Sequence, residues 1–183
     1  MLLQRVQAIG GPPLEPGWRY FSLTQVNNKR EGWTVWQAPE EEVVRGRAAF
    51  KAAEAARRQG AFERLHMRLL EARHRDGRDI DDEDVVMAIA AEAEINVERF
   101  REDFADPALL QSLARDHQQA VAEHGVFGTP TFVFPAGSAY VRLSRAPEGA
   151  EATKLFDELV AIIAGEPALL EIKRPKRREP DES

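Results

Sequence analysis

The sequence predicts an α/β fold in which a block of helices interrupts one small sheet. Strand-like runs rich in bulky and aromatic residues lie at 18–23 and 131–143, whereas residues 39–124 between them have helical periodicity almost throughout. An amphipathic helix is expected over 148–164. Strands on both sides of a helical block favour one sheet with an inserted helical subdomain over two separate domains.

The composition excludes several classes of protein. The chain has 183 residues and is 43% hydrophobic, which suits one compact domain with a sizeable core. Its 25 basic and 31 acidic residues give a formal charge of −6, which argues against a nucleic-acid partner. There is no cysteine, so this polypeptide itself can form no disulfide, thiolate metal site or reactive thiol. No apolar run approaches the ~20 residues that span a bilayer, so we expect a cytoplasmic protein with no membrane partner.

The N-terminal part is expected to contain a helix, a strand and a loop before the helical block. Apolar residues at helical spacing predict a helix over 2–9, which Gly10-Gly11-Pro12-Pro13 ends. Trp18–Leu23 is an aromatic-rich strand candidate, and a packed loop follows at 32–39. Pro39 and the three glutamates after it suit a helix N-terminus, so a helix is expected from Pro39 to Gly60.

Capping residues divide the rest of the block into helices. One helix is expected over 62–73, a second after a cap at Asp81 or Asp82, and a third after a cap at Asn96. A fourth helix is expected from Asp106-Pro107 to His124, and Gly125 follows its end. A β-hairpin of Thr131–Phe134 and Ala139–Leu143 follows, with its turn at 135–138. Leu169–Ile172 is a candidate short strand, and residues 173–183 have the composition of a mobile, solubilising charged tail.

Three segments carry a family resemblance. They are Phe21-Ser22-Leu23, the stretch from Lys51-Ala52-Ala53-Glu54 through Gly60-Ala61-Phe62 to His66, and the Gly- and Pro-containing loop and strand Gly125–Phe134. In this order they resemble the DsbA family of thioredoxin-fold proteins, including its FrnE-like members and the related kappa-class glutathione transferases and 2-hydroxychromene-2-carboxylate isomerases. The resemblance covers about Trp18 to Ala164 and implies a thioredoxin-like fold with a large all-helical insertion.

The resemblance also implies a domain division and a substrate-binding loop. The thioredoxin-like part would comprise residues 1–38 and 118–172, the helical insertion 39–117, and the tail 173–183. Phe127, Gly128, Thr129 and Pro130 correspond to the family's loop, in which the backbone before a cis-proline pairs with a bound peptide. The implied partner is a protein thiol or disulfide, or a small-molecule thiol.

The sequence departs from the family at the catalytic motif. The family carries Cys-x-x-Cys at a helix N-terminus, where the dipole lowers the thiol pKa, and the glutathione-using relatives carry a serine there. The only candidate helix here, Met1–Ile9, has neither residue. We therefore expect an N-terminally incomplete thioredoxin-like fold that is redox-inactive, with no catalytic residue and no cofactor of its own. A gap in the sheet would be filled by a partner chain, which makes a homodimer one expectation, or by residues 1–9 or 169–172.

Two other functions stay open beside a parent thiol–disulfide oxidoreductase. One is an isomerase or transferase of the kappa type that depends on a small-molecule thiol, and the other is a non-catalytic binding member. No metal site is expected. His117 and His124 share a helical stripe but lack a third ligand, and the acidic run at 79–84 has the wrong spacing for a calcium loop, so both are interpreted as structural.

Overall fold

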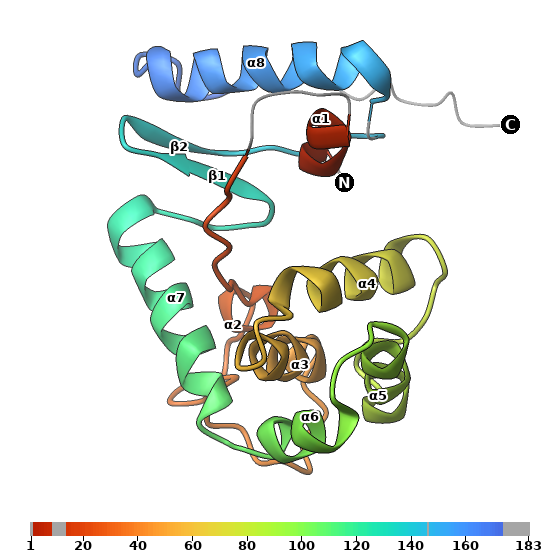
Figure 1. Cartoon of the computed structure of the whole chain (residues 1–183). Coiled ribbons are helices and arrows are strands. Elements are labelled where there is room, and N and C mark those ends of the chain that lie inside the picture. The colour runs from red at the N-terminus through yellow and green to blue at the C-terminus, as the bar shows by residue number, and fades with distance from the viewer. Residues whose placement is uncertain (1, 9–13, 146, 174–183) are drawn as a thin grey trace, which may run out of the picture. The chain divides into compact units, whose positions relative to one another are not determined.

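The computed structural model describes residues 2–8, 14–145 and 147–173, which fall into two compact units. Residues 17–129 form the helical unit. Residues 1–16 and 130–183 form the hairpin unit, of which the described part contains α1, β1, β2 and α8 (Figure 1). The boundaries of these two units lie where few contacts join one part of the chain to the other, and they say nothing about family origin. The predicted division into a thioredoxin-like part and an insertion therefore stays a prediction.

The helical unit has six helices within its described residues. They are α2 (Leu23–Val26), α3 (Arg47–Arg57), α4 (Phe62–His74), α5 (Glu83–Glu92), α6 (Val97–Phe104) and α7 (Leu109–His124). The expected caps of α5 and α6 are confirmed, because Asp82 accepts from the N–H groups of Asp84 and Val85 and Asn96 accepts from that of Arg99. Gly125 ends α7 in a left-handed conformation with φ of 60°, also as expected.

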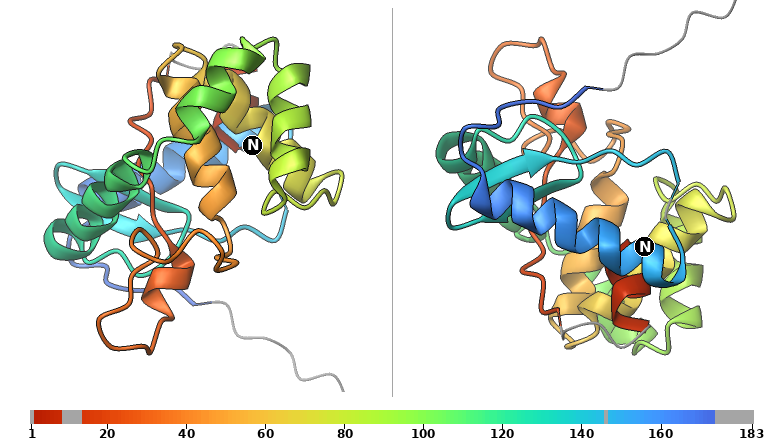
Figure 2. Two further views of the ribbon diagram at one scale, coloured as in Figure 1. Left: turned by 90° about the horizontal axis from the view of Figure 1, so that it is seen from below. Right: turned by 90° about the horizontal axis from the view of Figure 1, so that it is seen from above.

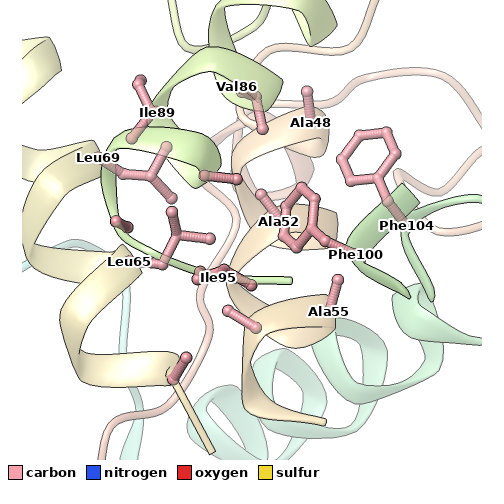
Figure 3. Packing of buried hydrophobic residues seen from close by; sticks show 14 of the residues in the cluster. Ala48, Ala52, Ala55, Leu65, Leu69, Val86, Ile89, Ile95, Phe100 and Phe104 are labelled. Carbon is pink, nitrogen blue, oxygen red and sulfur yellow. The ribbon is translucent and has the colours of Figure 1, made fainter. Parts of the chain in front are cut away.

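Helix α3 is central in this unit and contacts α4, α5, α6 and α7. Its buried face consists largely of alanines, whose small side chains let larger residues of the surrounding helices pack closely. Figure 3 shows Phe100 and Phe104 of α6 beside α3, and Leu65, Leu69 and Ile89 on the side of α4 and α5. Phe100 and Leu65 are fully buried, so this cluster forms the main core of the unit.

The expected start of α3 at Pro39 was wrong. The helix begins at Arg47, after Gly46, whose φ of 85° lies in the left-handed region and interrupts a helix. The guanidinium of Arg47 donates to the carbonyl oxygens of Ala38 and Pro39, at 3.1 and 2.8 Å, and to those of Glu40 and Glu42. These bonds stabilise a compact turn where the sequence predicted two helical turns.

The expected strand over Trp18–Leu23 was also wrong. Residues 14–22 have no regular secondary structure, and α2 starts at Leu23 with the Ser22 hydroxyl accepting from the N–H of Gln25 at 3.1 Å. Strand pairing needs a neighbouring strand, and the strands among the described residues are β1 and β2, which pair with each other in the hairpin unit. Residues 18–22 instead lie against α7.

The hairpin unit contains an antiparallel pair, β1 (Thr131–Phe134) and β2 (Gly137–Tyr140), joined by Pro135-Ala136. The first strand is confirmed. The second begins two residues earlier than the expected Ala139 and ends before Leu143, because the turn has two residues instead of four. A Cβ on Gly137 would lie 3.1 Å from the carbonyl oxygen of Ile163, so glycine allows the end of α8 to approach the turn.

Helix α1 (Leu2–Ala8) packs on helix α8 (Gly149–Gly165), and α8 also packs on the hairpin (Figure 2, right). Their shared core contains Leu2, Val6, Ala152 and Phe156, with Phe132 of β1 packed against it. Both helices agree with the sequence prediction, and residues 9–13 lie outside the described residues. No helix among the described residues is long and apolar enough to cross a membrane.

The expected strand over Leu169–Ile172 was wrong. This segment has no regular secondary structure, and the side chains of Leu169, Leu170 and Ile172 are 44%, 94% and 68% exposed. The expected charged tail lies outside the described residues except for Lys173, which is exposed. The C-terminal apolar segment therefore contributes no strand to the hairpin of its own unit.

Candidate functional site

An extended segment is held against α7 by hydrogen bonds to side chains. The N–H of Tyr20 donates to Oδ2 of Asp116 at 3.0 Å, and the N–H of Ser22 donates to Nδ1 of His117 at 3.3 Å. Residues two apart in an extended chain direct their N–H groups to the same edge. Two adjacent side chains of α7 therefore satisfy the backbone groups that a neighbouring strand would satisfy in a sheet.

His117 belongs to a buried aromatic group. Its side chain is 6% exposed, and its ring centroid lies 4.6 Å from that of Phe21 and 5.6 Å from that of Trp36. Burial lowers the pKa of His117, and an Nδ1 that accepts a hydrogen bond requires a neutral ring. His124, two turns further along α7, is exposed. Within the described part of the chain, no group of three or more His, Asp or Glu side chains is placed to hold a metal ion.

A polar cluster around Glu54 connects the extended segment to α3 and α7. The hydroxyl of Tyr20 donates to Glu54 at 2.8 Å, and those carboxylate oxygens also accept from Arg57 at 3.1 Å and from Ser112 at 3.2 Å. Burial, and next the hydrogen bond to Glu54, raise the pKa of Tyr20 far above its usual range. The guanidinium of Arg57 lies 3.8 Å from the centroid of the Phe62 ring. The cluster fixes Tyr20 as a neutral hydrogen-bond donor.

His66 of α4 is the second histidine with a perturbed pKa. Its ring stacks on Phe62 with centroids 5.1 Å apart and lies 4.8 Å from the Trp18 ring. Burial lowers the pKa of His66 to about 4. Its Nε2 atom is buried and makes no hydrogen bond within the described residues. A protonated imidazole at this place would lose solvation without gaining a partner, so His66 is neutral at pH 7.

The loop after α7 carries the predicted substrate-binding residues. Gly125 turns the chain, and the N–H of Val126 donates back to the carbonyl oxygen of Ala120 at 3.0 Å. The side chain of Phe127 is 67% exposed. Gly128 is buried, whereas Thr129 and Pro130 are exposed. The loop therefore presents the Phe127 ring together with Thr129 and Pro130 on the surface.

Pro130 lies immediately before β1, the usual place for a residue that has no N–H to give to a sheet. Its carbonyl oxygen accepts from the N–H of Val141 at 3.0 Å, which continues the ladder of the hairpin by one residue. The hairpin thus fixes the end of the loop at the strand entrance. The cis form of the Thr129–Pro130 bond stays a prediction.

The arrangement suits binding better than covalent chemistry. The four loop residues are contiguous, and the loop contains no cysteine, histidine or carboxylate. An exposed aromatic ring next to exposed backbone is the kind of surface that takes an extended peptide. A shallow depression on α8, lined by Ala150, Thr153, Lys154, Asp157 and Glu158, lies in the hairpin unit and does not include the loop residues.

Sequence reasoning missed the side chains that hold the extended segment. Asp116, His117 and Glu54 have partners 96, 95 and 34 residues away in the chain, and no local pattern connects those positions. An adjacent Asp-His pair on the buried stripe of α7 was the only available signal. Such a pair shows that polar groups on this helix need hydrogen-bond partners, but it does not show which residues those partners are.

A family model described as the DSBA-like thioredoxin domain matches residues 34–158, or 125 of the 183 residues. The match includes two of the three segments that carried the resemblance, the one at 51–66 and the one at 125–134. No curated protein matches the chain. The mixture of helices with a small two-stranded sheet in the described residues is consistent with a thioredoxin-like fold. The chain belongs to the DSBA-like thioredoxin domain family.

Proposed function

We propose that this chain serves thiol–disulfide exchange on protein substrates, and that its own share is to bind the substrate at the loop Phe127–Pro130. The observation that carries the proposal is an exposed loop, with the Phe127 ring 67% exposed beside the exposed Thr129 and Pro130, in a DSBA-like domain that has no cysteine. Because thiolate attack on a disulfide needs a sulfur, the attacking thiol has to belong to a partner that is not among these 183 residues.

The binding mode follows from the exposed groups. Thr129 is exposed and offers its backbone to an extended peptide, and Phe127 offers an apolar ring for one of the peptide's side chains. The implied substrate is an unfolded or flexible protein segment that carries a thiol or disulfide. An extended segment is needed because folded elements have already paired their backbone groups.

The first test concerns redox activity. The 183-residue chain should not accelerate the reduction of insulin by dithiothreitol, since no residue can form a mixed disulfide. The measurement is the onset of turbidity with the chain, with buffer, and with a cysteine-containing thioredoxin as the positive control. Turnover that scales with the amount of this chain would contradict the proposal.

The second test concerns binding. A fluorescent extended peptide with one free cysteine thiol should bind the chain, and Phe127→Ser should weaken that binding about tenfold, which corresponds to the loss of one buried aromatic contact. Fluorescence anisotropy measures the dissociation constant. Val43→Ser is the matched control, because Val43 is an apolar residue that is 91% exposed elsewhere in the helical unit.

The alternatives give different results in the same assay. Equal loss of affinity in both variants, or no binding at all, would overturn the proposed role of the loop. Saturable binding of reduced glutathione together with failure to bind the peptide would favour the isomerase or transferase that uses a small-molecule thiol. Peptide binding that does not discriminate between thiol-containing and thiol-free sequences would favour a non-catalytic binding member.

A further inference from the structure

The helical unit has two hydrophobic clusters, and the extended segment Trp18–Ser22 belongs to one of them. The main core is formed by residues of α3 to α7 and of the loops between them, and among the described residues none of its members precedes Ala48. The second cluster contains Tyr20 and the partly buried Trp18. Detaching the segment would therefore leave the packing of the main core in place.

His117 fixes the end of this segment in two ways. Its Nδ1 accepts from the N–H of Ser22 at 3.3 Å, and its ring lies against Phe21, whose side chain is buried. An imidazole nitrogen accepts a hydrogen bond only while it carries no proton, so the neutral ring has its proton on Nε2 and a second proton can go only to Nδ1. That proton would point at the N–H of Ser22, and two buried donors that face each other are both left unsatisfied.

Within the described part of the chain, no charged group is placed to stabilise a protonated His117. From the other elements the ring meets the Phe21 ring, the Trp36 ring and the N–H of Ser22, which are all uncharged. On α7 itself the adjacent charged side chain is Asp116, whose Oδ2 already accepts from a backbone N–H of the segment. Burial lowers the pKa of His117, and no charged neighbour counteracts it.

The segment, and not the helix, is the part that can move. His117 lies within the 16-residue helix α7, whereas residues 14–22 have no regular secondary structure. Besides the bond to His117, the hydrogen bonds from the segment to the helices are those of Tyr20 with Asp116 and Glu54. A donor–donor contact at His117 is therefore relieved most easily when the segment leaves α7.

Helix α2 limits this movement to the residues before it. The Thr24 hydroxyl donates to the carbonyl oxygen of Arg45 at 3.1 Å, and the Gln25 side chain accepts from the N–H of Val35 at 2.9 Å. Neither bond contains a titrating group, so both persist when His117 takes up a proton. Helix α2 therefore anchors one end of the segment.

We propose that the segment Trp18–Ser22 is a pH-sensitive strap, which α7 holds while His117 is neutral and releases when His117 binds a proton. Release ends the donor–donor contact, lets the charged ring reach water, and uncovers the apolar side chains of the second cluster on which Tyr20 packs. The main core stays packed. The inference concerns the helical unit alone and does not depend on peptide binding at the loop.

Nuclear magnetic resonance of the isotope-labelled wild-type chain between about pH 7 and 4 tests the proposal. The imidazole nitrogen signals of His117 report its protonation, and the amide signals of Tyr20 and Ser22 report whether the strap is bound. We expect these signals to change at the same pH, with the two amides reaching the shifts of an unstructured chain. The amides of Ile89 and Phe100 in the main core should keep their native shifts at that pH.

Two results with the wild-type chain would overturn the proposal. One is a protonated His117 with the Tyr20 and Ser22 amides still at their native shifts. The other is a strap that stays bound until the amides of the main core are lost in the same step.

His117→Gln separates the switch from a general weakening by acid. The glutamine oxygen can still accept from the N–H of Ser22 but takes up no proton, so the strap transition should move down by at least about one pH unit or merge with unfolding of the main core. His74→Gln, at the exposed end of α4, is the matched control. A strap transition that stays at the wild-type pH in His117→Gln would contradict the assignment to His117.

Discussion

Replacing Phe100 with alanine should lower the free energy of unfolding of the helical unit by about 3–5 kcal/mol. The Phe100 side chain is fully buried between α3 and α6, and its ring centroid lies 6.0 Å from that of Phe104. The neighbouring alanines of α3 have no side-chain length with which to fill the space (Figure 3). The cavity therefore stays open, which places the cost toward the upper end for such a change.

Denaturant unfolding followed by tryptophan fluorescence measures this loss. The three tryptophans are Trp18, Trp33 and Trp36, and all lie in the helical unit, so their signal reports on that unit. Phe127→Ala is the matched control, because the same atoms are removed from a ring that is 67% exposed, and a change within about 0.5–1 kcal/mol is expected. A loss below about 1 kcal/mol for Phe100→Ala would show that the cluster is not the main core.

The helical unit should lose stability as the pH falls from about 6.5 toward 4. Burial lowers the pKa of His66 from 6.5 to about 4 and also lowers that of His117. In this pH range the two imidazoles bind protons in the unfolded chain but not in the folded chain, so the free energy of unfolding decreases as the pH falls. The stability that they contribute is fully present only above the pKa that histidine has in the unfolded chain. His66 alone accounts for a loss on the order of 2–3 kcal/mol.

Two variants assign this loss. His66→Phe keeps a stacked ring without a titrating group, and His117→Gln keeps an acceptor for the N–H of Ser22, so each should flatten the pH profile of the unfolding free energy. His74→Gln, at the exposed end of the same helix as His66, is the matched control. A slope between pH 6.5 and 4 that is the same in all three variants would contradict the assignment to the buried histidines.

Local signals predicted the helical block well. The caps at Asp82 and Asn96 and the left-handed Gly125 act within a few residues of the helix ends they define, so their effect is visible in a short stretch of sequence. The apolar periodicity of α4 and α8 also placed those helices close to their observed ends. The family resemblance, and no local signal, identified Phe127–Pro130 as a substrate-binding loop, and that role stays a prediction.

Side-chain contacts that no short sequence pattern shows decided the elements that were wrong. Trp18–Leu23 has the composition of a strand, but its amides bond to Asp116 and His117, about 95 residues away. The start of α3 depends on one guanidinium that binds four carbonyl oxygens around Pro39. Leu169–Ile172 has strand-like residues, but within the described part of the chain no strand pairs with it. A strand is defined by its partner, which short-range pattern reading cannot supply.

Nuclear magnetic resonance tests directly whether this chain, which has no thiol, binds an unfolded substrate at the loop after α7. Amide resonances of an isotope-labelled chain are followed while a thiol-containing extended peptide is added. We expect saturable shifts centred on Phe127, Gly128 and Thr129, which disappear in Phe127→Ser. Shifts centred instead on the depression of α8 around Thr153 and Asp157, or no shifts at a large excess of peptide, would contradict it.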